Sequence, residues 1–69
     1  MILNKDNKFT LKEGDILRFP ESDYTVISLH PGFYRNTLSL TIQINKTGQW
    51  IYCTPSSGFY GAEVIRKEN

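Results

Sequence analysis

Residues 37–44 constrain the fold of this chain more than any other segment. Four aliphatic residues alternate there with threonine, serine and glutamine: Leu38, Leu40, Ile42 and Ile44. Because successive side chains of a strand point to opposite faces of a sheet, the alternation predicts one apolar face and one hydroxyl- and amide-rich face. A helix would scatter the same four side chains around its axis. We therefore predict a long, half-buried antiparallel strand over residues 37–44.

Several other runs are short and rich in β-branched and aromatic residues, which favour strands. They predict strands over residues 16–19, 24–29, 49–53 and 62–65, with a shorter extended piece over residues 9–12. No run of ten or more residues has a helical period, and at most one helical turn fits, near residues 59–63. We therefore predict an all-β domain of five or six short strands, arranged as a small barrel.

Glycine and proline mark the turns between these runs. Gly14 and Gly48 are expected to adopt the left-handed backbone conformation. Pro20 is expected to end one strand, and Pro31 with Gly32 the next, because proline cannot donate a ladder hydrogen bond. Outside the strands, the largely polar residues 1–8 predict a flexible arm and residues 66–69 a solvated tail.

A chain of 69 residues is one domain, which we assign to residues 1–69, and it buries only about 60% of its unfolded surface. Cys53 and His30 are each alone, so neither an internal disulfide nor a zinc site of four Cys or His ligands can form. The 4 Phe, 4 Tyr and 1 Trp must then supply much of the core. The net charge is +1, and no run resembles a signal peptide or membrane span. We expect a cytoplasmic protein with no metal, no cofactor and no membrane partner.

Residues 11–18, Leu-Lys-Glu-Gly-Asp-Ile-Leu-Arg, and residues 24–27, Tyr-Thr-Val-Ile, resemble the opening of many small SH3-like barrels. A tight hairpin into residues 49–53, then a near-helical turn before a short last strand, is similar to the other end of such barrels. The resemblance spans residues 11–65 and implies that the first and last strands adjoin. The chain lacks the acidic loop and the Ala-Leu-Tyr-Asp run of SH3 domains that bind proline-rich peptides. An OB-like barrel is the alternative architecture.

The tripeptide Gly-Phe-Tyr occurs in two loops, at residues 32–34 and 58–60. Aromatic rings beside polar and cationic groups give a large contact area at low entropic cost. Phe33, Tyr34 and Arg35 are therefore our first candidates for a binding surface, with Tyr60 as a possible neighbour. The alternative is that Phe33 and its counterpart in the second loop close the open ends of the barrel and belong to its core.

Trp50 and Tyr52 share one face of their predicted strand, and Ile51 and Cys53 share the other. If the aliphatic and cysteine side chains fill the interior, the two aromatic residues are exposed and can join the binding surface. In the alternative arrangement Trp50 is the largest member of the core. The sequence leaves both arrangements open.

No set of residues predicts catalysis. A nucleophile pair of Cys53 and His30 requires a strand end and a loop to converge, and a buried free cysteine more often acts as a small apolar residue. Phosphate-binding, dinucleotide and serine-elbow motifs are absent from the sequence. We predict a non-catalytic module that binds a protein partner, resembling the small adaptor or inhibitor proteins of bacteria and their phages. The alternatives are a nucleic-acid-binding barrel and a subunit that pairs with a copy of itself.

Overall fold

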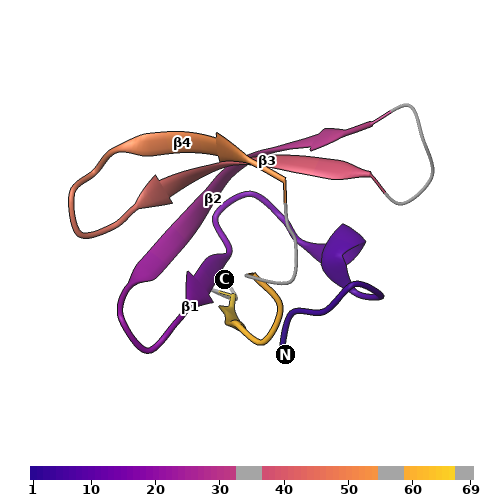
Figure 1. The fold of residues 1–69 in the computed structure, drawn as a ribbon, viewed down its shortest axis with the longest axis horizontal. Coiled ribbons are helices and arrows are strands. Elements are labelled where there is room, and N and C mark those ends of the chain that lie inside the picture. Colours follow the sequence, from indigo (N-terminus) through magenta and orange to yellow (C-terminus); the bar gives the residue numbers. More distant parts are fainter. Residues whose placement is uncertain (33–36, 55–58, 67–69) are drawn as a thin grey trace.

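The computed structural model describes residues 1–32, 37–54 and 59–66, and its strands form one antiparallel sheet (Figure 1). The strands are β1 (Ile16–Arg18), β2 (Asp23–Pro31), β3 (Leu38–Ile44), β4 (Trp50–Cys53) and β5 (Glu63–Ile65). Their order in the sheet is β4-β3-β2-β1-β5. The all-β prediction is confirmed. Among the described residues β4 does not pair with β5, so the sheet is open where we predicted a barrel.

The predicted alternation of buried and outward-facing residues is confirmed in β3. Leu38, Leu40 and Ile42 are buried, with 0–2% of each side chain exposed, and the residues between them are only partly covered. The strand pairs with β2 on one side and β4 on the other, which makes it the centre of a three-stranded meander. The tight turn that follows β3 places Gly48 at φ 78°, in the left-handed region predicted for it.

Strand β2 continues through Pro31, where we predicted that it would end. The amide of Gly32 donates a hydrogen bond to the carbonyl of Thr37 across the β2–β3 pair. Since neighbouring backbone groups alternate in direction, the nitrogen of Pro31 faces away from β3. It faces a side that β1 does not reach, because β1 pairs only with the first residues of β2. Proline is tolerated at such an unpaired position.

An extra residue in β2 changes which side chains face the core. The register pairs Val26 with Ile42 and then Ser28 with Thr41, so Ile27 has no partner of its own. Such a β-bulge shifts the alternation of the strand by one residue. Val26 therefore faces the core before the bulge, whereas Ser28 lies on the opposite face after it.

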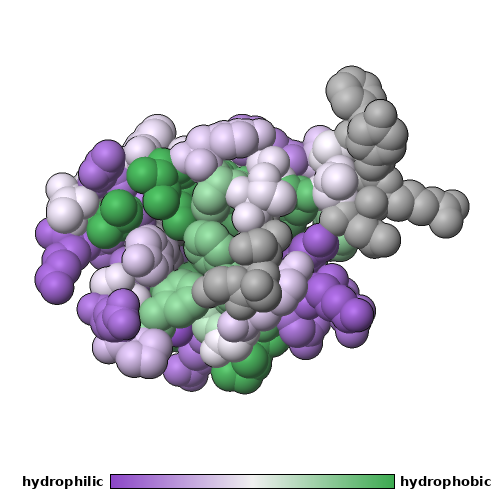
Figure 2. All heavy atoms as spheres, in the orientation of Figure 1, coloured by the Kyte–Doolittle hydropathy of each residue, from purple (hydrophilic) through white to green (hydrophobic). Residues whose placement is uncertain are grey.

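The core lies between the meander and the layer formed by β1, β5 and the N-terminal segment. Its buried members are Leu3, Leu11, Leu17, Val26, Leu38, Leu40, Ile42, Ala62 and Val64. In the face shown in Figure 2, apolar and aromatic side chains run through the middle and polar side chains flank them on both sides. Burial of the leucine, isoleucine and valine side chains among them stabilises the fold by about 1.5–3 kcal/mol each before entropy is subtracted.

The N-terminal residues belong to this layer, although we expected residues 1–8 to form a flexible arm. Leu3 is fully buried, and its amide and carbonyl bond to residues 62 and 61. Ile2 forms a bridge with Glu63, which covers the outer edge of β5. A 3-10 helix, Lys8–Thr10, follows where we predicted an extended piece. Leu3 ends a run of only three apolar residues, Met1–Leu3, which is too short to give a periodic signal from which its burial could be predicted.

A buried carboxylate ties the turn before β1 to the residue that follows β5. Asp15 is 2% exposed and accepts hydrogen bonds from the Lys12 amide at 2.8 Å and from Nε and Nη2 of Arg66 at 2.9 and 2.8 Å. Nη2 of Arg66 also donates to the carbonyl of Thr10. Burial by itself raises the pKa of Asp15, but the hydrogen bonds and charges of Arg66 and Lys12 outweigh burial and lower the pKa below 3.8.

Candidate functional site

The three-stranded part of the sheet has a face that points away from the core, which we call the outer face. Nine of its described side chains form the part of this face around β3 and β4: Thr25, Ser28, His30, Ser39, Thr41, Gln43, Trp50, Tyr52 and Thr54. The alternation of β2 also places Asp23 and Ile27 on this side, next to Thr25. None of the nine is aliphatic, and none is Lys, Arg, Asp or Glu. This part of the face is therefore aromatic and hydroxyl-rich, and the described charges beside it are the paired Asp23 and Arg18 at the β1 side.

Trp50 and Tyr52 are the most prominent side chains of the outer face. They are 59% and 68% exposed, so of the two arrangements that the sequence left open the structure has the one with both aromatic side chains outside and Ile51 and Cys53 inside. Their neighbour Ile51 points inward against the core, as the crowded interior requires. Large aromatic side chains rarely remain this exposed on a small domain, and Trp and Tyr are enriched at the centres of binding interfaces.

His30 extends the aromatic area across the sheet from β2. Its ring lies 5.5 Å from the ring of Tyr52, centroid to centroid, at an interplanar angle of 39°. Nε2 of His30 lies 3.0 Å from the hydroxyl oxygens of Ser28 and Thr41, which hold the ring in place. A fixed ring loses little side-chain entropy on binding, so the His30–Tyr52 pair is suited to contact a partner.

The bulge in β2 places His30 on the outer face, and this separates it from Cys53. Cys53 pairs with Leu40 and packs against the core on the opposite face of the sheet. Burial raises the pKa of the Cys53 thiol, which disfavours the reactive thiolate. The two residues considered as a nucleophile pair are therefore on different sides of the sheet.

The residues predicted to form one binding surface do not lie together on the outer face. Phe33, Tyr34 and Arg35 lie outside the described residues. Tyr60 is half-buried and packs against the core, so it does not join Trp50 and Tyr52 on the outer face. Sequence reasoning missed His30, because its strand was expected to end there and the bulge leaves no turn residue as a signal.

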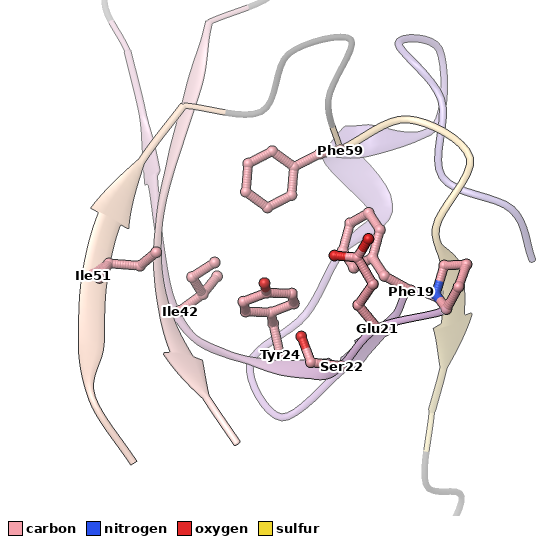
Figure 3. A pocket seen from close by; sticks show the side chains of 8 residues that line it. Phe19, Glu21, Ser22, Tyr24, Ile42, Ile51 and Phe59 are labelled. Carbon is pink, nitrogen blue, oxygen red and sulfur yellow. The ribbon is translucent and has the colours of Figure 1, made fainter. Parts of the chain in front are cut away.

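A pocket of about 320 Å³ lies on the inner side of the sheet, where the β1–β2 connection faces β3 and β4 (Figure 3). Its aromatic wall is a chain of edge-to-face contacts: Phe19 lies 5.5 Å from Tyr24 and 6.0 Å from Phe59. Ile42 and Ile51 form the facing aliphatic wall. The pocket and the outer face are thus on opposite sides of the same strands.

Comparison with protein-family models, with curated proteins and with solved structures finds no match. Within residues 1–32, 37–54 and 59–66, no three His, Cys, Asp or Glu side chains are grouped so that they could hold a metal ion. In the same residues no helix has the length and apolar character needed to cross a membrane. The function is therefore argued from the two surfaces described above.

Proposed function

We propose that the protein is a non-catalytic binding module that recognises a protein partner through its outer face. The observation that carries this proposal is the exposure of Trp50 and Tyr52 on a regular sheet beside the fixed ring of His30. Aromatic side chains on a rigid sheet bury much area at little entropic cost. The surrounding hydroxyl groups of β2 and β3 supply hydrogen bonds that adapt to a partner's backbone.

The charge of the outer face favours a protein over a nucleic acid. Aromatic rings on an open sheet can stack on bases, which supports the nucleic-acid alternative. Affinity for nucleic acid, however, comes mainly from neutralisation of phosphates by Lys and Arg. None of the nine outer-face residues around β3 and β4 is Lys or Arg. A partner that contributes apolar and hydrogen-bonding groups rather than phosphates therefore fits this face better.

We further propose that the fold is SH3-like. The meander of β2, β3 and β4, with β1 lying between β2 and β5, supports this proposal because the first and last strands adjoin. The short length of β1 and β5 is also consistent with a small SH3-like domain. An OB-like arrangement is the alternative, and an experimental structure that closes β4 onto a sixth strand would favour it.

The binding proposal is tested by affinity capture from cells that produce the protein, with the tagged chain as bait. The variant pair Trp50→Ala and Tyr52→Ala removes the two exposed rings without opening the core. Phe9→Ala is the matched control, because Phe9 is 48% exposed but lies on the 3-10 helix away from the sheet face. Each capture is washed at low and high salt, with and without nuclease.

We expect a discrete protein that survives nuclease and high salt, is captured equally by Phe9→Ala and is lost with the double variant. Capture that the double variant retains would refute the outer face as the contact surface. Nucleic acid that is recovered at low salt and lost at high salt would replace the proposal by the nucleic-acid alternative. A mass that rises with protein concentration, with no captured partner, would favour self-association.

A further inference from the structure

We propose that the inner pocket is a second contact site, which takes the side chain of a lysine from a protein partner. The pocket is separate from the outer face, since it opens on the other side of β3 and β4. Its volume of about 320 Å³ is at the lower end of ligand sites, which suits one side chain rather than a larger ligand. This inference rests on the proposed function in one respect: the protein partner is what supplies the lysine.

The charge of the pocket favours a cation. Among the described residues that line it, Glu21 is the one with a formally charged side chain. The nearby Arg18 does not line the pocket and is bound to Asp23, at 3.2 Å. A lysine ammonium beside the Glu21 carboxylate therefore meets an opposite charge and no competing cation from the pocket lining.

The polar groups of the pocket match the number of donors of a lysine. Within the described part of the chain, the side-chain oxygens of Glu21, Ser22 and Tyr24 make no hydrogen bond or ion pair. Figure 3 shows Glu21 and Ser22 on the β1–β2 connection, with Tyr24 of the aromatic wall beside Ser22. An ammonium group carries three N–H donors, whereas a guanidinium carries five and a quaternary ammonium none. A primary ammonium can thus give one N–H to each of these three acceptor groups and leave no donor without a partner.

The remaining walls of the pocket can contact both the methylene groups and the ammonium group of a bound lysine. Ile51 and Phe59, which are only partly buried, present carbon surface against which methylene groups can pack, and Ile42 lies buried behind them. The rings of Phe19 and Tyr24 stand edge to face at 84°, so the pair offers a ring face as well as a ring edge. A cation over a ring face gains about 0.5–1 kcal/mol at an exposed site, or about two- to fivefold in affinity.

The test is an NMR titration of the isotope-labelled full chain with Nα-acetyl-lysine N-methylamide. The norleucine analogue is the neutral control of nearly equal length, and the arginine analogue and choline are the cationic controls. Ring signals of Phe19, Tyr24 and Phe59 report on the pocket, and the indole of Trp50 reports on the outer face. Glu21→Gln removes the charge at constant size, and Glu13→Gln, in the turn before β1, is its matched control.

We expect the lysine probe to shift the pocket rings and to bind about threefold or more tightly than the norleucine probe. Glu21→Gln should weaken lysine binding about two- to fivefold and leave norleucine binding unchanged, whereas Glu13→Gln should change neither. Equal binding of norleucine, tighter binding of arginine or choline, or the absence of shifts at the pocket rings would overturn the assignment. The probes use no partner, so these results and the capture experiment with Trp50 and Tyr52 can fail independently.

Discussion

The buried carboxylate of Asp15 gives the most quantitative prediction. Asparagine at this position has the same shape but only one acceptor oxygen. In one orientation the amide oxygen takes the place of Oδ2 and keeps the hydrogen bonds from the Lys12 amide and from Nη2 of Arg66. The NH2 group of the asparagine then faces Nε–H of Arg66, so two donors oppose each other. In the other orientation two donors are left facing the amide. Asp15→Asn therefore loses at least one charge-assisted hydrogen bond in either orientation.

The size of the effect follows from that count. A hydrogen bond to a charged group contributes about 1.5–3 kcal/mol, and the solvent-accessible side of the pair reduces this. We expect Asp15→Asn to lower the free energy of unfolding by about 2 kcal/mol. For a domain of this size each kcal/mol shifts Tm by about 4–8 °C, so Tm should fall by about 8–16 °C. Asp6→Asn, an exposed carboxylate on the N-terminal segment, is the matched control and should change Tm little.

The pH dependence provides a second, independent test of the same carboxylate. Because the folded-state pKa of Asp15 is lowered from 3.8, its contribution is complete above pH about 4 and is lost as the pH falls through the folded-state value. Chemical unfolding followed by circular dichroism at a series of acidic pH values should show a shallower loss of stability for Asp15→Asn than for the wild type. Equal stability of the two proteins, with equal acid slopes, would refute this account of the Asp15–Arg66 pair.

Three further predictions follow from burial. Trp50, the only tryptophan, should emit at the long wavelength of a solvated indole and be quenched by iodide in the native state; a blue-shifted, unquenched emission would contradict its exposure. Cys53 should react more slowly with a disulfide reagent at pH 8 in the native state than in urea, because burial raises its thiol pKa; equal rates would contradict this. Leu40→Ala should lower the free energy of unfolding by about 2–5 kcal/mol in urea titrations, because Leu40 is fully buried. Ile2→Ala, at a side chain that is 55% exposed, should have a small effect, and similar losses of stability in the two variants would contradict the assigned core.

Sequence reasoning predicted those features of the fold that repeat locally. Leu38, Leu40 and Ile42 reveal the buried face of β3 because a period of two has one structural explanation. The hairpin at Gly48 was predictable because a left-handed turn position favours glycine. In contrast, the bulge at Ile27 lies in an uninterrupted run of strand-forming residues, so no residue marks the change of face.

Features that depend on distant contacts could not be predicted in the same way. Asp15 and Arg66 are 51 residues apart, and neither shows in the sequence which of the other charges it will meet. For Trp50 the pattern fixed a shared face with Tyr52, but the choice between core and solvent depends on what the opposite face packs against. The candidate site was predicted in part for the same reason: its two exposed rings were named, and His30 was not.

The pairing of the two chain ends has a consequence for the order in which the molecule can assemble. Strands β2, β3 and β4 pair only with their neighbours in sequence, so the meander can form while later residues are still being synthesised. Leu3 and Leu17, however, become fully buried only after residues 61–66 have been synthesised and have paired with β1 and with the N-terminal segment. In refolding followed by pulsed hydrogen exchange, the amide of Ile42 should become protected before that of Val64, and the opposite order would contradict this sequence of events. The synthesis of β5, which follows the other strands of this sheet in the chain, therefore decides when the sheet stops exposing its hydrophobic surface to chaperones.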